Sequence, residues 1–359
     1  MINTITNFGK WCGAFFETGP VPKPSPREFL VIGHRGSPVY EVENTIASFE
    51  KAVEFDGVNA LEMDLSMLGD GEIVLWHDWD PTDHIAMARN QGFEPDVKFA
   101  PRLPKLKKYH RPLHELTYPE FIANFGYKEK ARNGKPVGAI IPTLEETLKW
   151  LKTKPQVRYV CWDIKTPERD GWIIPRMMTK LYSLLSEYEP HYKSVFLTPY
   201  IPIMEAMEAH CSHPNYMLDV EPPAGIILDP CKFTSSKMAI KYHNAFCDTI
   251  HPKAMTIGPW TTFKRVINCD VQTKKKFNAT NPRVPIDKIV GATINAREEM
   301  EALIGIGIDG LMSDDPKLLR QVADDLGMTL WPKESRPLTL RELQPWLRAP
   351  QSEPELAQK

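Results

Sequence analysis

The chain has no long apolar run and no dense set of cysteines, and each absence excludes a class of protein. Among its 359 residues there is no stretch of 18 or more uncharged apolar residues, so no transmembrane helix is expected. The six cysteines lie far apart and form no CxxC pair, which excludes a dense disulfide framework. We expect reduced thiols, and one or two disulfides in the second half of the chain are the alternative.

Neither sign of charge dominates the sequence. Lys and Arg together number 44 and Asp and Glu 46, which gives a net charge of −2. A nucleic-acid-binding surface needs an excess of basic residues, so no nucleic acid partner is expected. The first 20 residues carry one lysine and a short apolar patch broken by glycine, which is a poor secretory signal. A cytoplasmic location is therefore expected, and secretion is the alternative.

Proline is abundant, and its abundance predicts long loops. The chain has 33 prolines, about 9% of its residues, against a usual value of ~5%. Proline is excluded from helix interiors and central strands. Hydrophobic residues still make up 42% and charged residues 25% of the chain, which is the composition of a globular protein with an ample core.

Apolar runs of strand length alternate with helical patterns along most of the chain. Nearly all-apolar strands that are each followed by a helix indicate a parallel sheet buried on both faces. Eight such units fit an α/β fold of the (β/α)₈ TIM barrel class better than an open sheet. The strands are predicted over residues 29–36, 59–67, 157–165, 194–200, 215–221, 254–260, 289–296 and 309–314. Helices are predicted over residues 45–56, 143–154, 171–189, 202–211, 297–307 and 316–327.

One further strand, residues 72–78, breaks this alternation. It follows the second strand after only the short connection Gly69-Asp70-Gly71, and so short a connection allows only an antiparallel hairpin. The Asp-Gly pair in that connection is typical of a two-residue turn. With that turn, Asp64 lies opposite His77 in the predicted register.

The predicted barrel accounts for residues 29–330. Residues 1–28 are interpreted as an N-terminal extension, and residues 331–359 as a proline-rich C-terminal tail. Residues 79–142 form an insertion after the hairpin, with a basic segment over residues 98–111. This segment is interpreted as a solvated loop, and the alternative is a lid that attracts an anionic headgroup or a membrane surface. Between residues 97 and 114 the chain has no acidic residue and six basic ones: Lys98, Arg102, Lys105, Lys107, Lys108 and Arg111.

Two carboxylates stand close together on the second predicted strand. Glu62 and Asp64 are two residues apart, and such residues project to the same face of a strand. Neighbouring carboxylates repel each other unless a cation or a proton lies between them, and hard oxygen ligands suit Mg²⁺ or Ca²⁺. Asp163 and Lys165 repeat the spacing on the next parallel strand. We therefore predict a divalent-metal site of Glu62, Asp64 and Asp163, and a structural ion-pair network is the alternative.

Two histidines and an arginine are expected beside these carboxylates. His34 and Arg35 lie between glycines at the end of the first strand, where a barrel places its active site. An imidazole suits acid–base work near neutral pH, and an arginine suits a phosphate. With a metal ion, Lys165 and His77, this set suits a phosphodiester substrate. One histidine deprotonates the nucleophile and the other protonates the leaving alkoxide.

The residues before the first predicted helix have two interpretations. Asn44 is interpreted as the helix N-cap, because asparagine is a preferred residue there. Glu43 either favours the helix dipole or has a functional role, and the sequence leaves both open.

Six motifs fall in the chain in a recognisable order. They are His34-Arg35-Gly36, Glu43-Asn44-Thr45, Glu62-x-Asp64, Asp70-Gly71 with His77-Asp78, the IPTLEE segment at 141–146, and the GIDG segment at 307–310 that runs into Asp315-Pro316. Together they resemble the glycerophosphodiester phosphodiesterase family over about residues 29–327. The resemblance implies a TIM barrel with a small insertion, which hydrolyses glycerophosphodiesters to glycerol phosphate and an alcohol.

The resemblance also implies roles for single residues. Glu62 and Asp64 would hold a Ca²⁺ or Mg²⁺ ion, and His34 and His77 would form the acid–base pair. Two cationic side chains, Arg35 and Lys165, would contact the phosphate. A neighbouring hydroxyl of the substrate would attack phosphorus and give a cyclic phosphate that is then hydrolysed.

The chain departs from the family's usual pattern at its third metal ligand. The family usually has Glu there, in a Glu-x-Lys pair, whereas this chain has Asp163. The stretches ALEMDL and WDIKT are similar to sphingomyelinase D and phospholipase D enzymes, which share the barrel and use Asp at this position. A phospholipase D-like enzyme acting on lysophospholipids or sphingomyelin is therefore the alternative function, and a binding barrel without catalysis is a third. His34-Arg35-Gly36 favours the glycerophosphodiesterase branch.

Overall fold

The structure is a computed structural model that describes residues 26–131, 134–188, 190–210, 216–218, 246–250, 260–281 and 286–330. The predicted C-terminal tail and all but the last residues of the predicted N-terminal extension lie outside these segments. Within them, no helix has both the length and the apolar character needed to cross a membrane.

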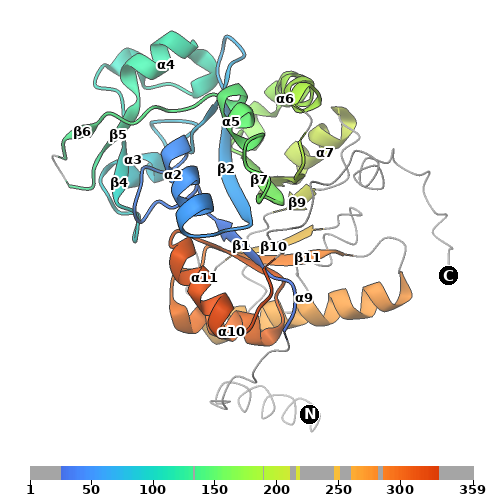
Figure 1. The fold of residues 1–359 in the computed structure, drawn as a ribbon. Helices are drawn as coiled ribbons and strands as arrows, with labels where there is room; N and C mark the ends of the chain where they lie inside the picture. Colours follow the sequence, from blue (N-terminus) through green and yellow to red (C-terminus); the bar gives the residue numbers. More distant parts are fainter. Residues whose placement is uncertain are drawn as a thin grey trace, which may run out of the picture.

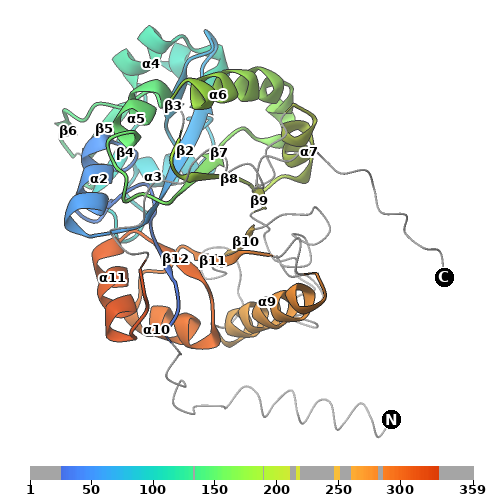
Figure 2. The same ribbon diagram turned by 45° about the vertical axis from the view of Figure 1, so that its right-hand side comes forward.

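Eight parallel strands form one curled sheet in the described part of the chain (Figures 1 and 2). The strands are hydrogen-bonded in the order β10-β11-β12-β1-β2-β7-β8-β9, and the two end strands, β9 and β10, contact each other. This is the cyclic order that a parallel barrel requires. The bounds are β1 Leu30–Gly33, β2 Ala60–Met67, β7 Tyr159–Ile164, β8 Lys193–Thr198, β9 Tyr216–Leu218, β10 Phe246–Ile250, β11 Lys288–Ala292 and β12 Gly310–Ser313.

The alternation of side chains along the strands divides the core in two. Leu30 and Ile32 of β1 and Ala60 of β2 belong to an inner apolar cluster, whereas Val31 and Leu61 belong to a larger outer cluster. Because side chains two residues apart share a face, Glu62 and Asp64 follow Ala60 onto the inner face. The pattern of the strand therefore directs both carboxylates into the barrel.

Helices cover the outer side of the sheet (Figure 2). Their starts follow local capping rules: Thr143 and Glu146 form a capping box at α5, and Asp315 caps α11 ahead of Pro316. The bounds are α2 Ile46–Glu50, continued by a π-helical turn η1 at Lys51–Phe55, α5 Leu144–Leu151, α6 Ile174–Tyr188, α7 Ile201–His210, α9 Trp260–Thr280, α10 Arg297–Ile306 and α11 Pro316–Asp325. A 3₁₀ segment η4, Glu168–Ile173, precedes α6.

The sixth strand of the barrel differs from its prediction. The predicted strand over residues 254–260 lies outside the described residues except for Trp260, which begins helix α9. The strand that stands between β9 and β11 in the barrel is β10, which was not predicted. Neither was the long helix α9, since its sequence is rich in polar residues and lacks a clear apolar stripe.

The short strand β3, Ile73–Leu75, pairs antiparallel with β2, but the predicted register is wrong by one residue. Met67 faces Ile73 and Leu65 faces Leu75, so the backbone N–H of Trp76, not of His77, donates to the carbonyl of Asp64. The cause is a turn of three residues, 69–71, in place of two. Gly71 closes it with a φ of 90°, which glycine adopts without strain.

The insertion, residues 79–142, packs as one cluster beside β2 (Figure 1). Its own core is aromatic, since Phe121, Phe125 and Tyr127 surround Trp76 with ring centroids 5.1–5.9 Å away. Its elements are α3 His84–Asn90, β4 Phe99–Arg102, η2 Lys107–Tyr109, η3 Leu113–Glu115, α4 Tyr118–Asn124, β5 Gly126–Glu129 and β6 Pro136–Val137. Strands β4, β5 and β6 form a separate small antiparallel sheet.

Two described cysteines differ in their oxidation state. Cys161 is a free, buried thiol on β7, whereas Cys269 on α9 is disulfide-bonded. The expectation of reduced thiols is therefore wrong for Cys269, and the alternative of a disulfide in the second half of the chain is the one that the structure contains.

Candidate active site

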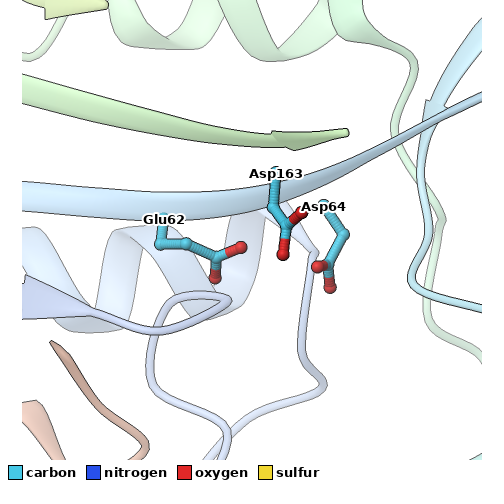
Figure 3. Close-up of side chains that lie close together, drawn as sticks. All are labelled: Glu62, Asp64 and Asp163. Atoms are coloured by element: carbon cyan, nitrogen blue, oxygen red, sulfur yellow. The ribbon is translucent and has the colours of Figure 1, made fainter. Parts of the chain in front are cut away.

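Three carboxylates meet at the carboxyl ends of β2 and β7, as the sequence predicts. Ligand oxygens of Glu62, Asp64 and Asp163 all lie within 4.8 Å of one another. Asp64 and Asp163 are register partners on the paired strands, and Glu62 precedes Asp64 on the same face. Figure 3 shows the three carboxyl groups turned to the same side of the two strands.

Glu62 carries an oxygen that no group in the described part of the chain satisfies. Its side chain is 1% exposed, and its Oε1 is buried without a hydrogen-bond partner. Burial first and the charge of Asp64 second raise the pKa of Glu62 to about 8. A buried polar atom without a partner costs free energy, and a cation between the three carboxylates would remove both the repulsion and this cost. The donor set and the orphaned oxygen therefore fit Mg²⁺ or Ca²⁺.

Lys165 contacts two of the three carboxylates of the acidic cluster. Its Nζ donates to Oδ2 of Asp163 at 2.5 Å and lies 3.0 Å from Oδ1 of Asp64. Burial would lower the pKa of Lys165, but Asp163 and Asp64 outweigh burial and raise it. Lys165 therefore carries a fixed positive charge at the edge of the cluster.

The turn after β1 brings His34 and Arg35 next to Glu62 of the acidic cluster. Arg35 and Gly36 have φ values of 53° and 93°, which fold the chain back on itself. Gly33 is required because an added Cβ would lie 2.5 Å from the carbonyl oxygen of Gly36. The backbone N–H of Arg35 donates to Oε2 of Glu62 at 2.8 Å. This turn therefore fixes the predicted histidine and arginine against the metal-ligand candidate.

His34 stands between two carboxylates. Its Nδ1 lies 2.7 Å from Oδ1 of Asp314, and its Nε2 lies 3.8 Å from Oε2 of Glu62. Burial and Arg35 lower the pKa of His34, but Asp314 and Glu62 outweigh them and the net pKa is raised. Asp314 is itself held by Asn295, whose Nδ2 donates to its Oδ2 at 2.7 Å. The imidazole is thus oriented by a carboxylate that a second side chain fixes.

His77 has the opposite electrostatic surroundings. Its Nδ1 lies 2.7 Å from Oδ1 of Asp78. Burial lowers the pKa of His77 well below its ordinary value, and the charges of Lys165 and Arg89 lower it further. His77 and Asp64 are close enough to shift each other's pKa, so His77 lies near the cluster although the predicted register is wrong. Both predicted histidines therefore stand beside the acidic cluster, each supported at Nδ1 by an aspartate.

Asn44 has a different role from the one that the sequence predicts. The N-cap of α2 is Thr45, whose side chain accepts from the backbone N–H of Ser48. Asn44 instead donates from Nδ2 to Oδ2 of Asp64 at 2.6 Å, and its Oδ1 accepts from the backbone N–H of Asp64. Its φ of 53° turns the side chain toward β2, and asparagine tolerates that conformation better than most residues.

Four further residues at the site were not predicted from the sequence. They are Arg89 and Glu94 of the insertion and Asn295 and Asp314 of the barrel. Each acts through partners far away in the chain: Arg89 is 46 residues from Glu43, and Asp314 is 280 residues from His34. A local pattern could have pointed only to Asp314, which lies between the quoted GIDG and Asp-Pro motifs.

The arrangement combines an acidic cation site, two imidazoles and two fixed cations in one place. Carboxylate oxygens can hold a divalent ion, and Lys165 with Arg35 adds positive charge that can stabilise an anionic substrate. Two imidazoles held by aspartates can take and give protons. This set matches the needs of phosphodiester cleavage, as the sequence analysis expects.

Comparison with known proteins agrees with this chemistry. A family model described as the glycerophosphoryl diester phosphodiesterase family matches residues 34–318. The chain is 25% identical over 296 residues to a glycerophosphodiester phosphodiesterase of Caldanaerobacter subterraneus subsp. tengcongensis, an alignment that covers 81% of this chain and 96% of that protein.

Solved structures share the fold. A glycerophosphodiester phosphodiesterase from Parabacteroides distasonis superimposes with a TM-score of 0.57 at 15% identity, over 84% of this chain and 99% of that one. A phosphodiesterase from Oleispira antarctica, in complex with the product sn-glycerol-3-phosphate, superimposes with a TM-score of 0.53 at 18% identity, over 84% of this chain and 97% of that one. The predicted TIM-barrel fold class is therefore confirmed.

Proposed function

Because the chain belongs to the glycerophosphoryl diester phosphodiesterase family, we propose that it hydrolyses glycerophosphodiesters to glycerol phosphate and an alcohol. The observation that supports this most is the meeting of three carboxylates with two aspartate-supported imidazoles at one end of the barrel. We further propose that residues 29–330 form the catalytic unit, with the insertion at 79–142 as part of it.

A divalent cation, Ca²⁺ or Mg²⁺, would be held by Glu62, Asp64 and Asp163. The orphaned Oε1 of Glu62 and the purely oxygen donor set support this assignment. When bound, such an ion supplies Lewis-acid stabilisation of charge on the phosphoryl oxygens. The shorter side chain of Asp163, compared with the family's usual Glu, would either draw the ion closer to β7 or leave room for a water molecule beside it.

His34 and His77 move the protons. One imidazole takes a proton from the attacking hydroxyl, and the other gives a proton to the leaving alkoxide, which is a poor leaving group at neutral pH. Asp314 and Asp78 accept at Nδ1 of the two rings, so each ring directs its Nε2 away from its aspartate. With a hydroxyl of the glycerol moiety as the nucleophile, the first product is a cyclic phosphate, which water then opens.

Lys165 and Arg35 bind the phosphate in this proposal. Lys165 is the better supported of the two, because its side chain is 18% exposed, against 7% for Arg35. Arg35 already faces three carboxylates: Nε lies 3.0 Å from Asp64, and Nη1 donates to Glu43 and Glu94. In this proposal its charge attracts the phosphate, and it also lowers the pKa of Asp64 and so keeps that carboxylate ionised.

The test is turnover of a water-soluble glycerophosphodiester, with release of glycerol phosphate as the readout. We expect His34→Ala and His77→Ala to abolish turnover of a substrate with an alkyl leaving group. A substrate with an activated leaving group should rescue only the variant that lacks the acid, which assigns the two roles. Wild-type turnover in either variant contradicts the acid–base pair. Turnover of lysophospholipid or sphingomyelin alone would replace the proposed substrate class.

We also propose a peripheral contact between the basic segment, residues 98–111, and anionic membranes. Lys105, Lys107 and Lys108 are exposed around Leu106, which is 55% exposed. Such a basic and apolar loop suits an anionic lipid surface. The test is cosedimentation with phosphatidylglycerol vesicles. Lys107→Glu with Lys108→Glu should weaken binding roughly tenfold or more, whereas the matched pair Lys275→Glu with Lys276→Glu on α9 should not. Equal effects of the two pairs would refute the contact.

A further inference from the structure

The insertion supplies one buried arginine to the surroundings of the active site. Arg89 lies in the last turn of α3 and is 5% exposed. All three of its guanidinium nitrogens contact carboxylates: Nη1 donates to Asp78 at 2.6 Å, Nε donates to Glu94 at 2.7 Å, and Nη2 donates to Glu43. An arginine that is buried and fully committed in this way cannot be a surface solubility residue.

Arg89 and Arg35 share two of these carboxylates. Glu43 accepts from Arg35 at Oε2 and from Arg89 at Oε1. Glu94 accepts from Arg35 at Oε1 and from Arg89 at Oε2. The four side chains therefore form a closed ring of alternating charge. Arg35 connects the ring to Asp64, because its Nε lies 3.0 Å from Oδ2 of Asp64. The ring is therefore in contact with a predicted metal ligand.

The third contact of Arg89 connects the same ring to a predicted catalytic histidine. Oδ1 of Asp78 accepts from Nη1 of Arg89 and lies 2.7 Å from Nδ1 of His77. Asp78 is 3% exposed, so water cannot replace a lost partner without a change in the structure. A continuous path thus runs from Asp64 to His77: an ion pair joins Asp64 to Arg35, and charge-assisted hydrogen bonds lead on through Arg89 and Asp78.

We propose that Arg89 is a positioning residue for the phosphodiesterase reaction: it fixes Asp78, and thereby the ring of His77, relative to the metal-ligand carboxylates. This inference rests on the proposed function. Only arginine can fill the position, because its rigid fork serves three carboxylates at once, whereas the ammonium of lysine is a point charge. The insertion is then a part of the catalytic apparatus and not an ornament on the barrel.

The test is a double-mutant cycle between Arg89→Met and Asp78→Asn, measured as kcat and KM on a soluble glycerophosphodiester. Supporting partners of functional histidines are typically worth roughly 10- to 100-fold, and we expect a loss of kcat of that size for each single variant, with KM changed less than about threefold. Because both changes act on His77 through one contact, the double variant should lose no more than about threefold beyond the weaker single variant.

Two further variants separate positioning from folding. Arg89→Lys keeps the charge but not the fork, so its kcat should fall while its melting temperature stays near that of the wild type. Arg169→Met removes an arginine outside the insertion and the site, one whose Nη2 donates to Oδ2 of Asp80 at 3.0 Å, and it should keep wild-type kcat. If Arg89→Met does not fold, Arg89→Lys carries the test alone.

Three results would overturn the inference. One is a wild-type kcat in Arg89→Lys. Another is a loss of kcat in the double variant that equals the product of the fold-losses in Arg89→Met and Asp78→Asn. The third is a loss of kcat in Arg89→Lys that only follows a loss of folded protein. Failure of the proposed function looks different, because wild-type turnover in His77→Ala would remove the histidine itself from the mechanism.

Discussion

The two ends of the barrel both bury charged side chains, but they balance those charges differently. At the carboxyl ends of the strands, Glu62, Asp64 and Asp163 crowd together, and Oε1 of Glu62 has no hydrogen-bond partner among the residues that the structure describes. At the amino ends, Asp287 accepts from the hydroxyl of Tyr159 at 3.1 Å and lies 3.4 Å from Nζ of Lys193.

The pKa values show the same contrast. Burial would raise the pKa of Asp287, but Lys288 and Lys193 outweigh it and lower the pKa. At the other end, burial and Asp64 together raise the pKa of Glu62 to about 8. The cationic partners of Asp287 outweigh its burial, whereas Lys165 and Arg35 pair with Asp64 and Asp163 and leave Oε1 of Glu62 without a hydrogen-bond partner among the described residues. The amino ends of the strands, here called the lower end, therefore serve a structural role. The carboxyl ends, here called the upper end, are suited to bind a ligand.

The largest expected effect is a loss of catalysis at the upper end. Glu62→Gln keeps the size of the side chain but removes the charge that would hold the ion. We expect turnover to fall on the order of 10³-fold or more, since a group that stabilises transition-state charge is lost. Calorimetric titration with Ca²⁺ should show a parallel loss of metal affinity. Undiminished turnover in this variant would contradict the contrast between the ends.

The matched change at the lower end should have the opposite profile. Asp287→Asn removes the carboxylate that serves Lys193, so the free energy of unfolding should fall by about 1–3 kcal/mol. The value of kcat should stay within about threefold of the wild type, because no predicted site residue contacts Asp287. Urea unfolding followed by circular dichroism measures the first quantity. A variant with normal stability and no turnover would refute the assignment of this end.

The third effect is a pH dependence of the free energy of unfolding of the metal-free protein. Glu62 has a pKa of about 8 in the folded chain and 4.5 as its ordinary value. Between these values the folded chain holds a proton that the unfolded chain has lost, so the free energy of unfolding falls as pH rises from 5 to 8. The difference between wild type and Glu62→Gln isolates this contribution. A flat difference over that range would show that Glu62 is ionised without metal.

The acidic cluster could be predicted from the sequence, since it depends on local spacing, whereas the group around Asp287 was not predicted. The two-residue separation of Glu62 and Asp64 places them on one face of any strand, and the parallel neighbour brings Asp163 beside them. The hairpin register could not be predicted, because the Asp-Gly pair suits a two-residue turn and the chain uses three residues. One residue of slip changes every facing pair.

The supporting residues were beyond the reach of the sequence for a different reason. Asparagine and threonine are both preferred N-cap residues. The sequence therefore does not show which of the neighbours Asn44 and Thr45 caps the helix, and in the structure it is Thr45. Arg89 lies in a short helix of the insertion, and its partners Glu43 and Asp78 come from two other segments. Such contacts are set by the packing of the insertion on the barrel and not by any local pattern.

The most direct test of the central claim is turnover of a glycerophosphodiester by the wild-type protein after treatment with a chelator. The claim is that Glu62, Asp64 and Asp163 together hold a divalent cation that the reaction needs. We predict that turnover disappears in excess chelator and returns when Ca²⁺ or Mg²⁺ is added back. Full turnover in excess chelator would contradict the claim.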